Sequence, residues 1–375
     1  MPIKTIVRNA RLLSGLILMG FVVCHLANLS IGLHSLEAME RWRVDLVGPW
    51  QTPLGGALLG FCALLHAGLG IYAIAVRHTL AMSRTDAVQL FLGVLTPPLL
   101  VSHVVVMGTA ANLVKEFEPS YGQILTVYWS VAPALAFQQL FAVLFVWVHA
   151  AIGLYSWLVL KPVWRRIGGL VVPLLFAVPI IALLGFAEAG KEVLAKLAQD
   201  GAWRDATLAM IHLLDPVRAE LNASQMRIVS VYGVFVLLGF VVFAVRRLYN
   251  RLSPVRIDYG EGLSALGRRG FSVLEVSRAN AIPHADVCSG RARCGTCRVR
   301  VESGAEKLSA ISDIERATLA RVGAAAGDRL ACQARVLASG VTVTRLLPAY
   351  ADASAARHPD DWAEGEPDPA GTVTR

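Results

Sequence analysis

Four cysteines in the last third of the 375-residue chain are spaced like metal ligands. Cys288, Cys294 and Cys297 fall on one short stretch of small residues and arginines, CSGRARCGTC, and Cys332 follows after 34 further residues. Three thiolates on one loop and a fourth far downstream is the layout of a [2Fe–2S] centre, although the plant-type spacing has one residue fewer between the first two cysteines. The small residues allow the backbone to wrap tightly and to aim N–H groups at the sulfurs.

The arginines of this stretch have two possible roles. Arg291, Arg293 and Arg298 would favour the more negative reduced cluster and raise its potential, or hold the loop against an anionic membrane face. The alternative to a cluster is a structural zinc site. Zinc sites usually combine two paired half-sites, and only Cys294 and Cys297 form a CxxC pair. The spacing therefore favours the iron–sulfur interpretation.

A second set of possible ligands lies in the apolar part of the chain, where four consecutive apolar runs each carry one interior histidine. Ionisable residues at bilayer depth are costly and usually functional, and a neutral imidazole is a good axial ligand for haem iron. A single such histidine could be an interhelical hydrogen bond. Four on consecutive helices predict two haem b groups in a bundle core, with His25, His66, His103 and His149 as axial ligands.

The depth of each histidine in its span predicts how they pair. His66 and His149 lie 11 and 12 residues before the basic residue that follows their spans, roughly 16–18 Å from the inner edge. His25 and His103 lie deeper, at roughly 21–24 Å. We therefore expect an inner haem between His66 and His149 and an outer haem between His25 and His103. Small neighbours that would let a flat ring approach the helices are Gly20, Gly70, Ser102 and Gly153.

The elements that must position these residues include six apolar runs, each near the 20 residues that a membrane span needs. Lysines and arginines cluster before the first run and after the second, fourth and sixth, so the positive-inside rule places both termini in the cytoplasm. The net charge of +8 lies in those clusters rather than on one folded face, which excludes a nucleic-acid partner. The spans are expected near 12–33, 54–76, 87–110, 131–160, 170–189 and 228–245, within a membrane domain of residues 1–250, and an amphipathic surface helix is expected near 203–214.

The composition changes at residue 255, where short alternating strands and short helices begin. Strands are expected in VRIDYG, CRVRVESG and VTVTRLL, and helices in SVLEVSRANA and in SDIERATLARVG, which Ser312 opens. These elements predict a small α+β domain over 255–348. The segment 349–375 is rich in Ala, Asp, Glu and Pro and is expected to be a disordered acidic tail or linker. No internal repeat is strong enough to argue from.

The soluble part resembles the ferredoxin family over 255–348. The resemblance rests on SVLEVSRANAIPHADVCSGRARCGTCRVRVESG and on RLACQARV around Cys332, and it implies a β-grasp fold. The mixed charges of SDIERATLAR depart from the strongly acidic docking helix of the adrenodoxin-like branch. The expected fold class is therefore an all-α six-helix transmembrane bundle followed by a small α+β β-grasp ferredoxin domain.

The order of the two domains resembles the N-terminal half of certain bacterial class III adenylate cyclases. The stretches RLLSGLILMGFVVCHLANLSIGLHSLEAME and FVWVHAAIGLYSWL look like their six-helix anchor, which is similar to the dihaem cytochrome b subunits of succinate dehydrogenase. The resemblance covers about 1–348 and implies b-type haem at the four histidines, a redox input and a bacterial inner-membrane location. Family members often carry HxxNH, whereas Leu29 follows Asn28 in this chain. No cyclase carboxylates precede Arg375, so any cyclase domain would belong to a separate or longer polypeptide.

Three functional hypotheses follow. In the first, the chain passes electrons between quinol-level haems and a cytoplasmic [2Fe–2S] centre. In the second, it is the redox-sensory region of an adenylate cyclase, with a cyclase or other output partner and a homodimeric state. In the third, it is a membrane anchor with a structural zinc domain. All three place it in a lipid bilayer. No nucleotide-binding fingerprint is present and no catalytic residue is expected.

Overall fold

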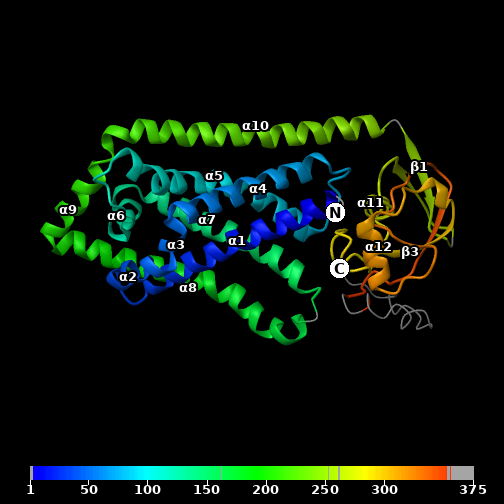
Figure 1. Cartoon of the computed structure of the whole chain (residues 1–375), viewed down its shortest axis with the longest axis horizontal. Helices are drawn as coiled ribbons and strands as arrows, with labels where there is room; N and C mark the ends of the chain where they lie inside the picture. Colours follow the sequence, from blue (N-terminus) through cyan, green and yellow to red (C-terminus); the bar gives the residue numbers. More distant parts are fainter. Residues whose placement is uncertain (1–2, 162, 252, 261, 353–354, 356–375) are drawn as a thin grey trace.

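Six long helices form an elongated bundle with a small sheet domain at one end (Figure 1). The computed structural model describes residues 3–161, 163–251, 253–260, 262–352 and 355. All six helices are long and apolar enough to cross a membrane, so the chain has the architecture of a multi-pass membrane protein. They are α1 (Ile3–Ile31), α4 (Pro53–Ala75), α5 (Arg84–Leu113), α7 (Pro133–Leu158), α8 (Trp164–Gln199) and α10 (Arg218–Arg251).

The last two long helices extend well beyond the expected spans of 170–189 and 228–245. Hydropathy alone marks the apolar centre of a helix. Good helix-forming residues such as those of KEVLAKLAQ continue it into polar surroundings. Pro173 and Pro179 lie inside α8. Membrane helices tolerate internal prolines when neighbouring groups form hydrogen bonds with the freed carbonyls.

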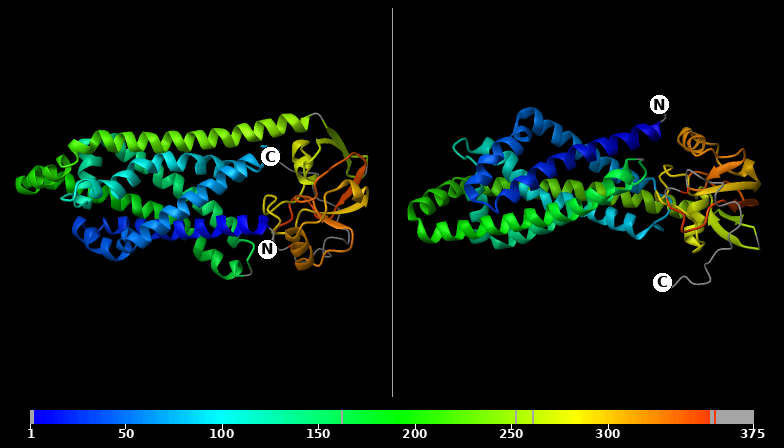
Figure 2. Two further views of the ribbon diagram at one scale, coloured as in Figure 1. Left: turned by 45° about the horizontal axis from the view of Figure 1, so that its top comes forward. Right: turned by 90° about the horizontal axis from the view of Figure 1, so that it is seen from below.

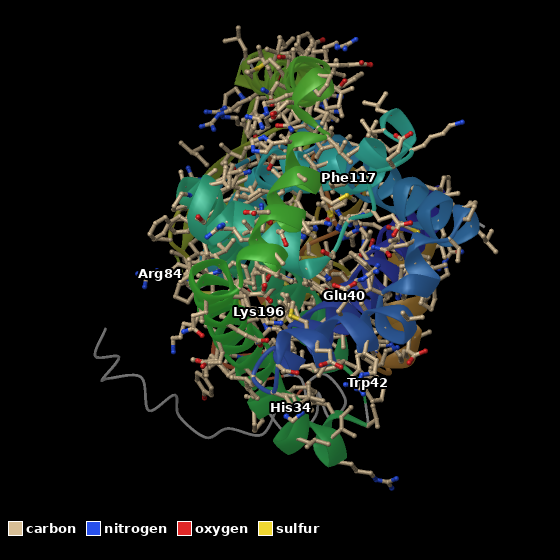
Figure 3. The ribbon with its side chains drawn as sticks, turned by 90° about the vertical axis from the view of Figure 1, so that its left-hand side faces the viewer. His34, Glu40, Trp42, Arg84, Phe117 and Lys196 are labelled. Atoms are coloured by element: carbon tan, nitrogen blue, oxygen red, sulfur yellow. The ribbon has the colours of Figure 1, made fainter. Side chains whose placement is uncertain are left out.

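Short elements cover the end of the bundle opposite the sheet (Figures 1 and 2): α2 (Leu36–Leu46), α3 (Gly48–Gln51), α6 (Tyr121–Thr126), the π-helical turn η1 (Val127–Val131), α9 (Gly201–His212) and the 3-10 turn η2 (Asp215–Val217). Two carboxylates connect α2 to α6 and to α8. Glu40, near the centre of the view in Figure 3, accepts a hydrogen bond from the Tyr121 backbone N–H at 2.8 Å. Glu192 accepts one from Leu36 N–H at 2.6 Å. Helix α9 lies where the amphipathic surface helix is expected.

Glycines bring helices α1 and α8 into backbone contact. An added Cβ on Gly185 would lie 2.1 Å from the Leu29 carbonyl oxygen, and one on Gly32 would lie 2.5 Å from the Gly185 carbonyl oxygen. Such close crossings are a common way to pack helices in a membrane, where van der Waals contact replaces the hydrophobic effect as the main attraction. Helix α1 also packs against α4, and α5 packs against α7 and α10.

The sheet domain has five strands in the order β2-β1-β5-β3-β4. The central pair β1 and β5 is parallel and the other pairs are antiparallel. Helices α11 (Val273–Ala279) and α12 (Asp313–Arg321) accompany this mixed sheet, so the predicted fold class is confirmed. The strands are β1 (Pro254–Asp258), β2 (Ser264–Arg268), β3 (Arg298–Ser303), β4 (Asp328–Leu330) and β5 (Val341–Arg345), and a 3-10 turn, η3 (Ala305–Lys307), follows β3.

Two alanines lie buried at the start of the segment 349–375, which is predicted to be disordered. Ala351 and Ala355 are buried in a small cluster with Ala285 and Leu347. Alanine is small enough to pack against a loop without the apolar periodicity by which a sequence signals burial. The remainder of the predicted disordered segment, 353–354 and 356–375, lies outside the described residues.

Two residues connect the bundle to the sheet domain. Helix α10 ends at Arg251 and β1 begins at Pro254, and the sheet domain lies at the end of the bundle where the chain begins (Figure 2). The N-terminal ends of α1 and α5 therefore come close to the cysteine loop, which lies between α11 and β3.

Candidate metal centres

The four predicted cysteine ligands lie together at the surface of the sheet domain's core. Cys288, Cys294 and Cys297 are on the loop between α11 and β3, and Cys332 follows β4. Their exposed fractions are 3%, 3%, 1% and 8%. This burial shields a bound group from water while leaving Cys332 nearest to the outside.

The four thiols lie as two interacting pairs, Cys288 beside Cys294 and Cys297 beside Cys332. The interaction with Cys294 lowers the pKa of the Cys288 thiol to about 5, whereas the same interaction and burial raise the pKa of Cys294. Among the described residues no three His, Cys, Asp or Glu side chains converge on one metal position. Two pairs suit a two-iron cluster, in which each iron takes two thiolates; a structural zinc ion would need four ligands around one point.

Hydrogen-bond donors surround these sulfurs. Arg293 N–H lies 3.5 Å from Cys288 Sγ, Thr296 N–H lies 3.4 Å from Cys294 Sγ, and Gln333 Nε2 lies 3.5 Å from Cys332 Sγ. Such donors stabilise negative charge on thiolates and raise the potential of a bound cluster. Of the small residues of the loop, Thr296 is the one whose backbone N–H is among these donors.

The loop owes its tight path to left-handed backbone conformations. Ser289 and Ala292 have φ of 53°, and Gly290 and Gly295 have φ of 81° and 80°. Residues with a Cβ rarely adopt this region. Helix α12 holds the strained loop from one side, because Thr318 Oγ1 donates to the Ala292 carbonyl at 2.7 Å.

The four membrane histidines meet in the expected pairs. The imidazole centroids of His25 and His103 are 6.0 Å apart, and those of His66 and His149 are 6.1 Å apart. Two imidazoles on opposite sides of one metal ion, each with a metal–nitrogen bond of about 2 Å, have centroids roughly 6 Å apart. The geometry of both pairs thus fits a bis-histidine metal centre.

Second contacts orient three of the four rings through Nδ1. His66 Nδ1 is 3.1 Å from the Arg11 carbonyl oxygen, and His149 Nδ1 is 2.8 Å from the Gln89 carbonyl oxygen. His103 Nδ1 lies 3.4 Å from the Tyr128 hydroxyl. Metal-bound histidines usually donate their other ring N–H in this way, which leaves Nε2 for the metal. His25 Nδ1 is buried without a hydrogen-bond partner among the described residues.

Two glycines outside the predicted set of small neighbours make room for the rings. An added Cβ on Gly15 would lie 2.9 Å from His66 Cε1, and one on Gly93 would lie 2.7 Å from His149 Cε1. Gly15 lies four residues after Arg11, and Gly93 lies four residues after Gln89. Arg11 and Gln89 are the residues whose carbonyls contact the ring nitrogens of His66 and His149. A missing Cβ at that position gives an imidazole access to the carbonyl one helical turn earlier.

The structure reveals an internal correspondence that the sequence alone did not. Helix α1 carries Arg11, Gly15 and His25, and α5 carries Gln89, Gly93 and His103 with the same spacing. In each set the first residue contacts a histidine ring through its carbonyl and the last is the deeper histidine. On α4 and α7, His66 and His149 are each followed after four residues by a glycine. The two histidine pairs are thus built by two similar halves, α1–α4 and α5–α7.

These two halves stand apart where the histidines face each other. Within the described residues, α1 packs closely on α4 and α5 on α7, whereas α1 does not pack closely on α5, nor α4 on α7. Gly70, one turn after His66, is half-buried, yet an added Cβ there would meet no heavy atom within 4 Å. A flat macrocycle requires such a separation between helices, so these residues fit a haem.

The other predicted small neighbours have different roles. An added Cβ on Gly20 would lie 4.0 Å from the Trp50 ring, and one on Gly153 would lie 3.1 Å from Gln89 Nε2. Ser102 accepts a hydrogen bond from Gln138 Nε2 at 2.9 Å. Of the four, Gly70 alone adjoins open space.

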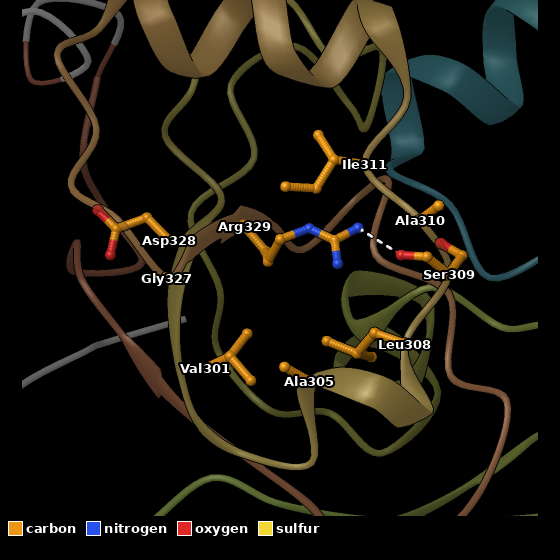
Figure 4. A pocket seen from close by; sticks show the side chains of 9 residues that line it. All are labelled: Val301, Ala305, Leu308, Ser309, Ala310, Ile311, Gly327, Asp328 and Arg329. Carbon is orange, nitrogen blue, oxygen red and sulfur yellow. Dashed lines mark hydrogen bonds between the residues drawn. The ribbon is translucent and has the colours of Figure 1, made fainter.

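A hollow of about 340 Å³ on the sheet domain has no cysteine in its lining (Figure 4). Arg329, which lines it, donates to the Ser309 carbonyl at 3.0 Å and to both oxygens of buried Glu315 at 2.8 and 3.1 Å. Because its guanidinium already donates to these groups, it does not offer a charged group for a ligand, and we assign no ligand to this hollow. Glu315 is an acid of α12 that points inward, which removes one acidic group from the surface of that helix.

Comparison with protein families defines the class of the soluble domain. Residues 258–337 match the family described as "2Fe-2S iron-sulfur cluster binding domain". The match includes all four cysteines. The chain is therefore an iron–sulfur electron-transfer protein with membrane helices, and a structural zinc domain is not supported.

Individual relatives resemble the same part of the chain. "Chlorosome protein I" of Chlorobaculum tepidum is 35% identical over 71 residues, 19% of this chain and 29% of that protein. The F component of the Na(+)-translocating NADH-quinone reductase is 28% identical over 109 residues in Chlamydia felis, 28% of this chain and 25% of that one, and 29% identical over 106 residues in Chlamydia pneumoniae, 28% and 24%. The chain thus spans less than a third of each relative. No solved structure matches it.

Proposed function

We propose that the protein is a dihaem b and [2Fe–2S] electron carrier of a bacterial inner membrane, with both termini in the cytoplasm. Quinol is the proposed partner within the bilayer. The observation that carries the proposal is the pair of imidazole contacts, 6.0 and 6.1 Å between centroids, in a bundle that ends beside the cysteine loop. The relatives that are named as components of an NADH-quinone reductase support a redox role for the soluble domain.

The chain's own residues would hold the groups as follows. Cys288, Cys294, Cys297 and Cys332 would ligate the cluster, and the four membrane histidines would ligate haem iron through Nε2. Bound haem and cluster would supply one-electron couples. The Arg11 and Gln89 carbonyls would keep His66 and His149 in the tautomer that leaves Nε2 unprotonated.

The test is a reduced-minus-oxidised absorption spectrum of the purified, haem-supplemented protein, with haem, iron, acid-labile sulfide and zinc assayed per chain. We expect low-spin b-type bands, two haems, two cluster irons and no zinc. Ala substitutions at His66 or His149 should remove one haem, and Ala substitutions at His25 or His103 the other. His212→Ala is the matched control, because this exposed histidine pairs with Asp215. Folded protein with cluster but without haem would overturn the haem assignment.

A second candidate uses the same centres as a sensor. The domain order, which resembles the anchor and ferredoxin of certain adenylate cyclases, supports a redox-sensory region that reports to a cyclase or other output partner as a homodimer. A cyclase domain fused after Arg375 would then change activity with the redox state of the haems. Rapid reduction of the haems by a short-chain quinol, with a fused cyclase that ignores the redox state, would favour the electron carrier instead.

A further inference from the structure

The loop that carries three of the cysteines touches the membrane bundle through one charged side chain. Arg291 Nη2 lies 2.7 Å from Asp86 Oδ1 and 3.0 Å from Gln89 Oε1, both in the first turns of α5. The hydroxyls of Ser83 and Ser289 are 3.4 Å apart beside this contact. The Asp86 side chain is only 9% exposed, so the contact is largely shielded from water, where charge pairing is stronger than at a surface.

Gln89 connects this contact to the candidate inner haem site. Its side-chain oxygen accepts from Arg291, while its backbone carbonyl is the 2.8 Å partner of His149 Nδ1. Two hydrogen bonds through one residue therefore separate the guanidinium from the imidazole. On the other side, Arg291 is three residues from Cys288, and its N–H donates to the Cys288 carbonyl at 3.3 Å.

The charges around Arg291 make Asp86 important. Arg11 and Arg77 are close enough to Arg291 to repel it, as is Arg293 on the same loop. Asp86 attracts both Arg291 and Arg77. Without this carboxylate the basic loop and the basic end of the bundle would repel each other, so the ion pair decides how the loop faces α5.

We propose that the bundle is the docking partner of the chain's own ferredoxin domain, and that Arg291 is the positioning residue that holds the cysteine loop over the His66–His149 pair. The proposal rests on the proposed function. A single electron would pass between the two centres, so that one is oxidised by one unit while the other is reduced by one, and no proton is required. An arginine suits the role because its guanidinium stays charged, and the two hydrogens of Nη2 can be shared between the Asp86 carboxylate and the Gln89 amide oxygen.

The test compares the full-length protein, loaded with both cofactors, with its Arg291→Gln, Arg291→Lys and Asp86→Asn variants. In wild-type samples poised or rapidly frozen so that the reduced cluster coexists with ferric haem, that haem should speed the spin relaxation of the cluster in electron paramagnetic resonance. Arg291→Gln and Asp86→Asn should lose this enhancement and slow haem–cluster electron exchange on the order of tenfold to a hundredfold. Arg291→Lys should recover it in part. Cofactor content should stay as in the wild type, and the midpoint potential of the cluster, measured separately, should fall in Arg291→Gln because a cation near the cluster is lost.

Two further variants distinguish positioning from general damage. The charge exchange Arg291→Asp with Asp86→Arg should restore the relaxation enhancement. Arg300→Gln, which breaks an Arg–Asp pair within the sheet domain at 3.1 Å, should leave it unchanged. Unaltered relaxation and electron exchange in Arg291→Gln would overturn the proposal.

Amide hydrogen exchange separates this proposal from the haem assignment. Residues 83–92 and 286–296 should lose protection in Arg291→Gln whether or not haem is bound. A wild type that carries a cluster but no haem would refute the proposed function, while the exchange result still decides the docking contact. Unchanged protection would refute that contact.

Discussion

A Cβ added to Gly93 on α5 would lie 2.7 Å from Cε1 of His149 on α7. Gly93→Ala should therefore displace the ring and weaken the proposed inner haem site. Alanine normally favours a helix over glycine by about 1 kcal/mol, so a loss would report the steric conflict rather than helix propensity. We expect haem per chain to fall from two toward one. Gly60→Ala, where an added Cβ meets nothing within 4 Å, is the control, and two unaltered low-spin haems in Gly93→Ala would contradict the prediction.

Gly295 should be equally intolerant in the cysteine loop. Its φ is 80°, and an added Cβ would lie 2.9 Å from Val322 Cγ1 on the segment that follows α12. We expect Gly295→Ala to lower the cluster's visible circular dichroism and the acid-labile sulfide per chain. Gly260→Ala is a matched control because Gly260 has a φ of 78° but open space around it. Equal losses in the two variants would mean that backbone strain alone is responsible.

The buried pair of Glu315 and Arg329 should contribute strongly to the stability of the sheet domain. Glu315 is 0% exposed and also accepts the Leu330 N–H at 2.9 Å. Glu315→Ala leaves a buried guanidinium without its carboxylate, which costs about 3–5 kcal/mol. Guanidinium-induced unfolding, followed by the cluster's visible absorption, measures the change. The exposed pair of Asp313 and Arg316 is the comparison, and Asp313→Asn should cost less than about 1 kcal/mol.

The sheet domain should lose stability in mild acid through His284. Burial, with the nearby charge of Arg345, lowers the pKa of this histidine from 6.5 to about 4. The unfolded chain therefore binds the proton first, so the stabilisation is complete above pH 6.5 and declines as pH falls toward 4, by on the order of 3 kcal/mol. Unfolding midpoints measured across this range should fall less steeply in His284→Gln. Parallel profiles for the two proteins would rule out His284 as the cause.

The membrane helices and the iron–sulfur domain could be predicted from the sequence, whereas the contacts around the candidate ligands could not. The six long helices follow from apolar runs of sufficient length, and the N-cap at Ser312 is confirmed, since its hydroxyl accepts the Glu315 N–H. Strands β2 and β4 were missed. The first contains Gly267 and lacks a clear alternation, and the second has three residues, all of them buried.

The missed site residues depend on tertiary packing. Nothing in the local pattern around Arg291 indicates Asp86, which is 205 positions away. Gly15 and Gly93 did leave a signal, because each precedes a histidine by ten residues on its helix. The repeat consists of only three positions on each of α1 and α5, which is too few to recognise in the sequence. It becomes clear once the structure shows that both helices contact an equivalent histidine.

The two-residue connection after α10 limits how far the sheet domain can travel. Three peptide steps from Arg251 to Pro254 span roughly 10 Å when fully extended. A domain on so short a linker cannot carry electrons between distant proteins, as domains on long linkers can. Any second protein that exchanges electrons with its cluster must come to the end of the bundle and meet it there.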